Sequence, residues 1–552
     1  MPRLLLVLLL FAMWRSPGPA SAASLSPCQF RFGFAALHRL LPTQVGGCLD
    51  DEQHDPVTGD AQQHATGGLL VWRRTTNLVS FTDGQTTWVL GPGGLQHRPN
   101  DQRLPVEGAW PTYLGNPERT GANANSALGP ASAPALVRQW AFATGGGIAA
   151  QPVVVNGVVY VGSWDGNEYA LDAATGALRW KTFLGVTASG GRCTPDVIGI
   201  TSTATVQDGV VYVGGGDDFW YALDAASGAV RWKVRTGDTS AAVGDYNWSS
   251  PFLWQGFAYV GVASMCDNPL AQGKLLQVSL QQQRIVRTFA VVPAGQVGGG
   301  LWTSPALDPA TNTVYVTTGN RHAGGEQPYA ESVLALEATT LAVKAQWQHP
   351  FNADLDADWG TTPTLFTGAA GRPLLAVGHK EGAVYTLDRT NLAAGPVWQR
   401  QIAVGGSCPT CGQGTIASSA FGQGRLYVGG GQTVIGGQTV IGGQTVIGGQ
   451  TVIGGQTVPG AVRALDPATG RVLWEHVTPG PVIAALAYGG GLVAAGGGDT
   501  LQVLDAGSGA PLFQFATTGP IDGAPSIAGA QVFVGSTDHH LYAFGLPAGT
   551  GS

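Results

Sequence analysis

Aspartate, asparagine, histidine and tryptophan side chains recur at two kinds of position in this chain. They follow the second apolar run of a repeated unit, or they precede the first run of the next unit. Together such side chains suit a polar, aromatic-lined ligand site, although each alone is equally suited to an ordinary turn. The sequence has no GxSxG elbow in context and no HExxH, so a hydrolase is not indicated. The residues are Trp164, Asp165, Asp217, Asp218, Asn247, Trp248, Trp302, Asn320, Asp358, Trp359, His379, Lys380, Asp538, His539 and His540.

These residues are spaced by a repeated phrase. Tyr169 to Trp180 reads YALDAATGALRW, Tyr221 to Trp232 reads YALDAASGAVRW, and weaker copies follow as far as a stub at Leu541. The first complete unit predicts four short strands, at 151–157, 158–163, 168–171 and 178–183, separated by turn residues. Four antiparallel strands per repeat are typical of one propeller blade. Within the phrase, we expect Asp172 to cap the turn, Gly176 to supply positive φ, and Trp180 to pack between blades.

The number of units predicts the architecture. Second strands fall at Val159, Val211, Ala258, Val314, Leu375, Leu426, Leu492 and Val532. We therefore expect an all-β protein, an eight-bladed β-propeller of four-stranded blades, with seven blades as the alternative if the degenerate third unit is misread. Residues 136–144 match a fourth strand and are expected to complete the last blade, which removes the exposed edges of the ring. In such a ring the chemistry-bearing residues share one face, around a central funnel.

Bulk properties limit the class of protein. Of 552 residues, 44% are hydrophobic and 11% charged, and 84 glycines suit many tight turns. The net charge is −7 with no basic cluster, so nucleic acid is not an expected partner. Residues 1–22 resemble a signal peptide, with a membrane anchor as the alternative, and no other segment is expected to span a bilayer. We therefore expect a secreted or extracytoplasmic protein.

Six cysteines, an even number in an oxidising compartment, predict disulfides. The simplest pairing is Cys28 with Cys48 and Cys408 with Cys411, which leaves Cys193 with Cys266. No histidine follows the CPTC motif, so haem attachment is not indicated. The expected divisions are a small disulfide-linked α+β module at 26–103, a linker at 104–134, the propeller at 135–547 and a tail at 548–552. A low-complexity GGQTVI insert at 430–458 lies within the sixth unit and is interpreted as an expanded repeat without function.

Two segments resemble known families. FGFAALH, GGCLDDEQ and TGGLLVWRR resemble a small N-terminal module found on secreted bacterial proteins. The propeller resembles the PQQ-repeat, quinoprotein alcohol dehydrogenase-like family, and WPTYLGNPERTGAN (110–123) is similar to the segment that leads into such propellers. GGGLWTSPALDPATNTVYVTTGN (298–320) and GHKEGAVYTLDR (378–389) are similar to that family's cofactor segments.

This resemblance implies specific roles. Trp302 would stack on the planar quinone PQQ, Asn320 would offer its amide oxygen to Ca²⁺, and Lys380 would contact the cofactor. A hard ion such as Ca²⁺ prefers oxygen ligands and would polarise a quinone carbonyl. An acidic calcium ligand is expected in the second unit, at Asp217 or Asp218. The chain lacks the adjacent cysteine pair often found in these enzymes.

Two functions remain open. The catalytic base, an aspartate expected after the TGN segment, is not identified among Glu326, Glu331 and Glu337. The sequence therefore favours a secreted ligand-binding or scaffold propeller, because the same repeats also build scaffolds without catalysis. Its partner at the funnel would be a small molecule, a polymer or a protein. The alternative is a PQQ- and Ca²⁺-dependent dehydrogenase that oxidises alcohols, including polymeric ones.

Overall fold

The computed structural model describes most of the chain after its first 27 residues. The described ranges are 28–54, 60–73, 78–91, 94–99, 108–123, 125–322, 326–350, 356, 358–435, 438–440, 446–447, 450–453 and 455–547. The expected signal peptide at 1–22 and the tail at 548–552 lie outside them. No helix within these ranges is long and apolar enough to cross a membrane.

A small α+β module begins the described chain. Its helical part consists of α1 (Phe32–Leu40) followed by α2 (Pro42–Val45). Phe34 and Leu37 of α1 are buried against the sheet, and the Cys28–Cys48 disulfide ties the two ends of the helical segment. The antiparallel sheet runs in chain order through β1 (Gln53–His54), β2 (Ala61–Ala65), β3 (Gly68–Arg73), β4 (Leu78–Thr82), β5 (Thr86–Gly91) and β6 (Gly94–Pro99).

The described residues after this module form eight antiparallel sheets, each built on four main strands, and two of these sheets carry a short fifth strand. The first four sheets are β9 (Val153–Val155), β10 (Val158–Gly162), β11 (Asn167–Asp172) and β12 (Leu178–Phe183); β15 (Thr205–Gln207), β16 (Val210–Gly214), β17 (Phe219–Asp224) and β18 (Val230–Arg235); β20 (Phe252–Trp254), β21 (Phe257–Ser264), β22 (Lys274–Ser279) and β23 (Arg284–Ala290); and β24 (Ala306–Asp308), β25 (Thr313–Thr317), β26 (Ser332–Glu337) and β27 (Val343–Gln348).

The remaining four sheets repeat the pattern. They are β28 (Thr364–Thr367), β29 (Pro373–Gly378), β30 (Ala383–Asp388) and β31 (Pro396–Gln401); β32 (Ala420–Gly422), β33 (Arg425–Gly430), β39 (Gly460–Leu465) and β40 (Val472–Thr478); β41 (Ala487–Gly489), β42 (Leu492–Gly497), β43 (Thr500–Asp505) and β44 (Pro511–Ala516); and β45 (Ser526–Ala528), β46 (Gln531–Gly535), β47 (His540–Gly545) and β8 (Val137–Ala143).

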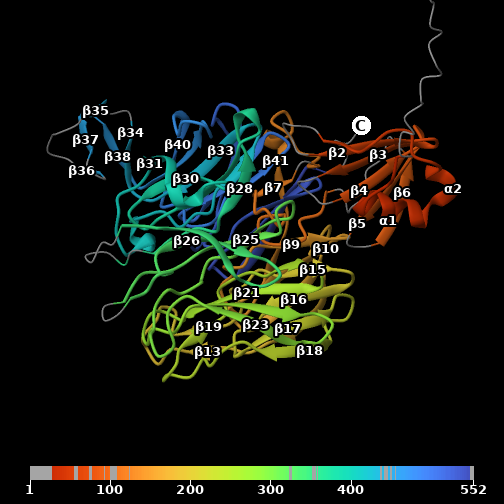
Figure 1. Ribbon diagram of the computed structural model, residues 1–552. Helices are drawn as coiled ribbons and strands as arrows, with labels where there is room; N and C mark the ends of the chain where they lie inside the picture. The colour runs from red at the N-terminus through yellow and green to blue at the C-terminus, as the bar shows by residue number, and fades with distance from the viewer. Residues whose placement is uncertain are drawn as a thin grey trace, which may run out of the picture.

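Short strands and 3₁₀ turns lie outside the main strands of these sheets. They are β7 (Ala122–Asn123), β13 (Thr187–Ala188), β14 (Val197–Ile198), β19 (Asp245–Tyr246), β34 (Thr433–Ile435), β35 (Gln438–Val440), β36 (Val446–Ile447), β37 (Gln450–Ile453) and β38 (Gln456–Val458), with 3₁₀ turns η2 (Ala133–Ala135), η3 (Ala369–Gly371), η4 (Leu392–Ala394) and η5 (Pro409–Cys411). The strands β34 to β38 belong to the insert, which leaves the sixth sheet between its second and third strands, as expected, and projects from the edge of the molecule (Figure 1).

The repeated phrase acts as a turn and as a packing device, as the sequence predicts. The carboxylate of Asp172 accepts hydrogen bonds from the backbone N–H groups of Ala174 and Thr175, at 3.1 and 3.0 Å. Gly176 has a φ of 72°. Trp180 Nε1 donates to the carbonyl of Ala225 in the next sheet at 3.0 Å. The phrase therefore fixes each turn and joins it to the neighbouring sheet.

The same tryptophan contact joins the last sheet to the first. The predicted strand at 136–144 is present as β8, and it pairs antiparallel with β47. Trp140 of β8 donates through Nε1 to the carbonyl of Ala173, at 3.0 Å, in the turn after β11. The first strand of the repeat region therefore completes the last sheet, and the sheets close upon themselves.

Most of the segment 110–123, which lies within the expected linker, is buried on the inner side of the sheets. Residues 110–123 contact the first strand of one sheet after another through backbone hydrogen bonds. These bonds run from Val154 N to Trp110 O, Val206 N to Pro111 O, Leu307 N to Pro117 O, Leu365 N to Glu118 O, Phe421 N to Thr120 O and Tyr488 N to Gly121 O, at 2.7–2.9 Å. This segment thus fills the axis and holds the inner strands together from within.

Arg119 is the charged centre of this axial segment. Its side chain is fully buried and donates to the carbonyls of Pro305, Pro251 and Tyr113, at 3.0, 3.0 and 2.5 Å. Burial lowers the pKa of Arg119 to about 9. A rigid guanidinium with five donors can satisfy several carbonyls at once, which a lysine cannot do.

A belt of hydroxyl groups surrounds the same axis. In five consecutive sheets a serine or threonine just before the inner strand accepts a hydrogen bond from a backbone N–H of the preceding sheet. The pairs are Gln151 N to Thr203, Thr203 N to Ser250, Ser250 N to Ser304, Ser304 N to Thr362 and Thr362 N to Ser418, at 2.8–3.0 Å. The belt satisfies backbone donors that would otherwise be buried without partners.

Candidate functional site

The segments leading into the inner strands share one equivalent position across the eight sheets. Strand register makes Trp302, four residues before β24, equivalent to a position in every other sheet. At this position seven residues are partly exposed, whereas the residues directly before and after are buried. The seven are Ala149, Thr201, Trp248, Trp302, Ile416, Ile483 and Asp522, and Gly360 is the eighth. These seven partly exposed positions therefore carry mostly apolar and aromatic side chains, with the carboxyl group of Asp522 among them.

Trp302 lies beside a buried lysine. Lys380 Nζ is 5.8 Å from the centre of the Trp302 ring, and it donates to Asp356 Oδ2 at 2.7 Å and Asp358 Oδ2 at 2.6 Å. Burial alone would lower the pKa of Lys380, but Asp358 and Asp356 raise it above its ordinary value. Lys380 therefore remains charged, and the two predicted cofactor contacts, Trp302 and Lys380, are neighbours.

A third carboxylate completes an acidic cluster. Carboxylate oxygens of Asp267, Asp356 and Asp358 lie within 4.8 Å of one another. Loss of hydration, followed by the charges of Asp358 and Asp356, raises the pKa of Asp267 to about 6. Burial and the charge of Asp358 also raise the pKa of Asp356, and Asp356 Oδ1 is buried without a hydrogen-bond partner. Three carboxylates against one lysine leave an excess of negative charge, which suits a cation.

Asn320 joins this cluster through its backbone. Its N–H donates to Asp358 Oδ1 at 2.7 Å, whereas no hydrogen bond of its side-chain amide occurs in the described structure. The amide oxygen of Asn320 is therefore available as a ligand beside the carboxylates.

Asp217 and Asp218 have other partners. Asp217 accepts from the backbone N–H of Phe219 at 3.0 Å and from the hydroxyl of Tyr221 at 2.8 Å. Asp218 pairs with Arg235 at 3.0 Å. Neither residue belongs to the cluster of Asp267, Asp356 and Asp358. Asp217 and Asp218 are thus held by contacts within their own unit, whereas Asp267, in the loop between the second and third strands of the third sheet, lies in the cluster with Asp356 and Asp358.

A second cluster lies behind this site, next to Lys380 in sequence. Glu331, His349 and His379 are buried, with ligand atoms within 4.8 Å of one another. Glu331 Oε1 is 3.5 Å from His349 Nδ1 and 3.8 Å from His379 Nε2. On spacing alone this cluster resembles a metal centre.

The hydrogen bonds of the two rings argue against a metal there. His349 Nδ1 faces the carbonyl of Pro350 at 2.9 Å, so this nitrogen carries a hydrogen. His379 Nδ1 accepts from the backbone N–H of Glu381 at 3.2 Å, which places the hydrogen of the neutral ring on Nε2. Both nitrogens that face Glu331 are therefore donors, whereas a metal needs their lone pairs. The cluster is a buried ionic network in which the carboxylates of Glu331 and Glu381 raise the pKa of His349 to about 9 despite burial.

Sequence reasoning did not assign Asp267 and Asp356 to the site. Asp356 stands two residues before Asp358 in DADWG, immediately ahead of an inner strand, and this position could have indicated it. Asp267 lies in a loop of the third unit, where the repeated phrase is degenerate. Only the folded chain brings these residues to Lys380.

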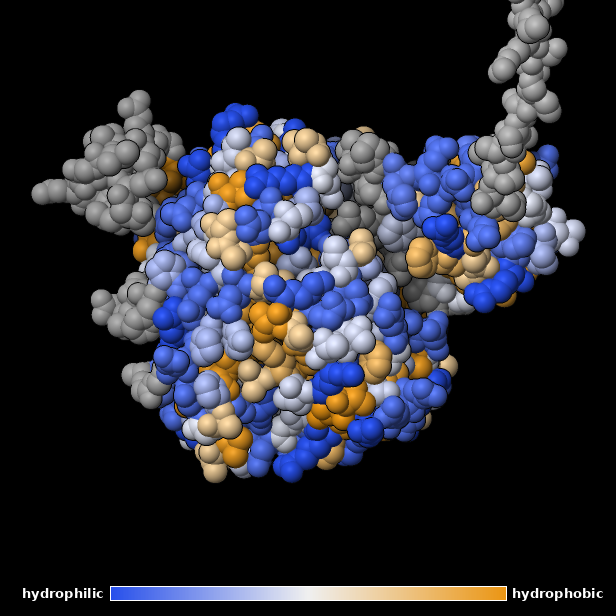
Figure 2. Space-filling view, viewed as in Figure 1, coloured by the Kyte–Doolittle hydropathy of each residue, from blue (hydrophilic) through white to orange (hydrophobic). Residues whose placement is uncertain are grey.

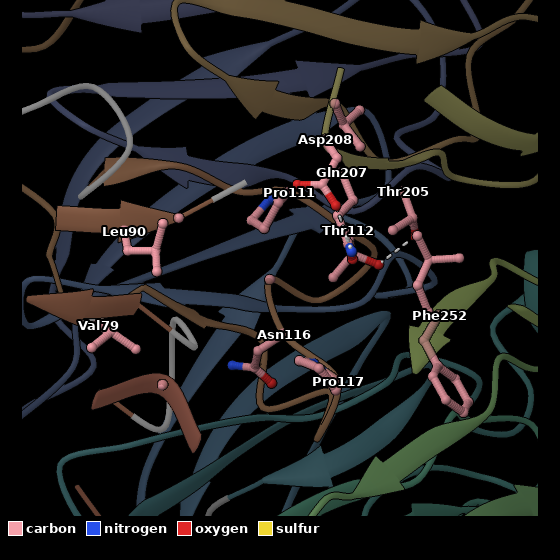
Figure 3. Close-up of a pocket in the computed structure, with 15 residues that line it drawn as sticks. Val79, Leu90, Pro111, Thr112, Asn116, Pro117, Thr205, Gln207, Asp208 and Phe252 are labelled. Atoms are coloured by element: carbon pink, nitrogen blue, oxygen red, sulfur yellow. Dashed lines mark hydrogen bonds between the residues drawn. The ribbon is translucent and has the colours of Figure 1, made fainter. Parts of the chain in front are cut away.

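A separate cavity of about 330 Å³ lies at the opposite ends of the strands. It is bounded by Val79 and Leu90 of the N-terminal module, by Thr112 and Asn116 of the axial segment, and by Phe252 (Figure 3). Thr112 and Asn116 already have hydrogen-bond partners within the protein. The cavity is thus a packing gap between two parts of the chain. The outer surface seen in Figure 2 is largely hydrophilic with scattered apolar residues.

The closed series of sheets around a funnel with these repeats defines a repeat-built β-propeller. A family model described as outer membrane protein assembly factor BamB matches residues 125–391 and 458–551, which is more than half of the chain. The chain belongs to the PQQ-repeat β-propeller family, which is quinoprotein alcohol dehydrogenase-like.

Individual relatives are dehydrogenases. The chain is 27% identical over 349 residues to polyvinylalcohol dehydrogenase of Sphingopyxis sp. (strain 113P3), covering 55% of this chain and 51% of that protein. It is 27% identical over 286 residues to quinohemoprotein alcohol dehydrogenase of Comamonas testosteroni, covering 44% and 39%. The chain spans about half the length, or less, of these relatives.

Solved structures share the fold. A europium-containing methanol dehydrogenase superposes with a TM-score of 0.64 at 18% identity, covering 80% of this chain and 98% of that one. The Comamonas testosteroni quinohemoprotein alcohol dehydrogenase superposes with a TM-score of 0.65 at 19% identity, covering 80% of each chain.

Proposed function

We propose that this protein is an extracytoplasmic quinoprotein dehydrogenase that oxidises alcohols with PQQ and Ca²⁺. The observation that carries the proposal is the meeting of Trp302, Lys380 and the three-carboxylate cluster at one side of the funnel. The dehydrogenase relatives favour this reading over a scaffold without catalysis. The disulfides Cys28–Cys48, Cys193–Cys266 and Cys408–Cys411 pair as expected and favour an oxidising compartment.

The proposed architecture is one closed eight-bladed ring. The eight sheets would be the eight blades of one propeller, with β8 as the outer strand of the last blade. The module at 26–103 and the insert at 430–458 would lie outside the catalytic unit. The single funnel would then be formed by all eight lead-in segments.

The residues present fit the two groups in their chemistry. The partly exposed ring of Trp302 offers an aromatic face, and Lys380 offers a cation to an anionic planar quinone. Asp267, Asp358 and the amide of Asn320 offer oxygen ligands to calcium. When bound, the quinone would accept the two electrons of the alcohol, and calcium would polarise its carbonyl.

A side chain of the protein would accept the proton of the alcohol hydroxyl. Asp356 is the proposed base, because its Oδ1 has no hydrogen-bond partner while Lys380 holds its Oδ2. Lys380 and the N–H of Asn320 fix Asp358 on both of its oxygens. The base would therefore be oriented by a charged, buried neighbour, and the apolar positions Ile416 and Ile483 would exclude water from the far side of the funnel.

Reconstitution tests this proposal. Purified protein would be incubated with PQQ and Ca²⁺, and assayed for reduction of an artificial electron acceptor with short alcohols and polyvinyl alcohol. We expect dye reduction in wild-type protein and at least a 100-fold loss in Trp302→Ala. The control is Trp254→Ala, at the end of strand β20 on the other face. Absence of both PQQ binding and dye reduction in the wild type would refute the dehydrogenase.

A further inference from the structure

The loop that carries Asp267 has little structure of its own. It connects β21 to β22, and Asp267 adopts a φ of 57°, in the left-handed region. Within the part of the chain that the structure describes, the N–H groups of residues 266–268 and 270 donate no backbone hydrogen bond. The adjoining residues are bonded, since Met265 N donates to Gly244 O at 2.9 Å and Ala271 N donates to Ser264 Oγ at 2.9 Å. Among the described residues, no backbone hydrogen bond donated by this loop therefore fixes the conformation of Asp267.

A covalent bond holds the loop at the neighbouring residue. Cys266 is joined to Cys193, 73 positions earlier, in the connection between the first and second sheets. Cys193 lies in a hydrogen-bonded turn, where its N–H donates to Ser189 Oγ at 2.9 Å and Ser189 Oγ donates to Asp196 at 2.6 Å. The disulfide therefore ties a loosely bonded loop to a well-bonded one.

Aromatic side chains pack around this bond. Cys193, Trp164 and Trp248 pack against the buried residues Tyr246 and Met265. Trp248 Nε1 also donates to the carbonyl of Ser264, directly before the loop, at 2.8 Å. Cys193 is thus packed among residues of the first and third units.

We propose that the Cys193–Cys266 disulfide is the positioning element for Asp267, so that the calcium site is complete only in the oxidised protein. The inference rests on the proposed function, because it assigns Asp267 as a metal ligand. A residue in a left-handed conformation, with a like-charged pair of aspartates facing it, leaves that position when its tether is cut. Ordering the loop before the cation binds removes an entropic cost from binding.

Terbium(III), a hard cation that seeks oxygen ligands, is a suitable probe. Its luminescence, sensitised by tryptophan excitation, would be titrated into the apo-protein and displaced with Ca²⁺. We expect saturable binding in the wild type and an affinity 10- to 100-fold lower in Cys193→Ser/Cys266→Ser, the range found when groups that orient a ligand are lost. Asp267→Asn, with the disulfide intact, should show a similar loss. Cys28→Ser/Cys48→Ser, in the N-terminal module, is the matched control and should bind as the wild type does.

The outcomes separate the two proposals. If the wild type binds no terbium(III) or Ca²⁺, the calcium site of the proposed function is refuted. If the wild type and the Cys193→Ser/Cys266→Ser protein bind with equal affinity, the positioning role of the disulfide is refuted. Because the variant could fold poorly, the wild type is also reduced and reoxidised, with near-UV circular dichroism as the folding check. Affinity must fall on reduction and return on reoxidation while the fold persists; unchanged affinity on reduction overturns the inference.

Discussion

Lys380 Nζ lies 2.6 Å from Oδ2 of Asp358, and the two residues flank the two inner strands of one sheet. Asp358 precedes β28 and Lys380 follows β29, so the pair closes the funnel end of that sheet. Asp358 also accepts a hydrogen bond from the backbone N–H of Asn320, which follows a strand of the preceding sheet. The Asp358 carboxylate therefore connects Lys380 and Asn320, and with them two neighbouring sheets.

Replacing Lys380 should disable the site. In Lys380→Met, Asp356 and Asp358 lose the cation that holds them, and we expect dye reduction to fall at least 100-fold. Loss of one partner from a buried ion pair also costs about 3–5 kcal/mol of folding free energy. The control is Lys274→Met, which removes the Lys274–Asp245 pair in the third sheet. Wild-type turnover in a folded Lys380→Met protein would contradict the role given to this lysine.

Stability should depend on pH through His349. Its pKa of about 9 lies above the ordinary value near 6.5, because Glu331 and Glu381 favour the charged ring. The stabilisation is therefore complete below about pH 6.5 and is lost as the pH rises through 9. We expect urea unfolding to show a loss of up to about 3 kcal/mol over this range in wild-type protein. The loss should be absent in His349→Gln and retained in His97→Gln, an exposed site; equal pH profiles for the wild type and His349→Gln would refute the assignment.

Arg119 should resist conservative replacement. Arg119→Lys keeps the charge but cannot reach the carbonyls of Pro305, Pro251 and Tyr113 together. We expect a destabilisation of about 2–4 kcal/mol, since buried carbonyls lose their donors. Arg179→Lys, at an exposed pair with Asp172, should cost less than about 1 kcal/mol. Equal denaturation midpoints for the two variants would show that the axial contacts contribute little.

Removing most of the insert should leave the protein intact. Deletion of 436–453 would join β34 to β38 through Gly454 and Gly455, and Ile435 already pairs with Gln456. Gly-Gly is well suited to a two-residue hairpin turn. We expect the melting temperature and dye reduction to be unchanged, as measured by differential scanning calorimetry and the acceptor assay. A loss of turnover with an unchanged melting temperature would assign the insert a functional role.

The local parts of the fold could be predicted from sequence because they depend on residues close together in the chain. Asp172, Gly176 and Trp180 lie within one phrase, and each has the contact expected of it. The strand that closes the ring could also be predicted from sequence. Residues 136–144 contain the tryptophan of a fourth strand, but the first three strands of a repeat do not precede them. The axial course of 110–123 could not, since its partners are spread over the whole ring.

The candidate site was harder to predict for the same physical reason. Trp302 and Lys380 stand in segments that carry family motifs, and the structure places them together. Asp267 reaches the cluster only through a loop of irregular conformation that a distant cysteine holds. Asp217 lies in a regular repeat, where it accepts hydrogen bonds from Tyr221 and from the backbone of its own turn.

The pairing of β8 with β47 sets the order in which the protein can be made. The side chain of Gln139 donates to the carbonyl of Leu546, 407 positions later, at 3.0 Å. A chain synthesised from its N-terminus must therefore keep β8 unpaired until β47 has been added. The ring can close only after both β8 and β47 are available to pair.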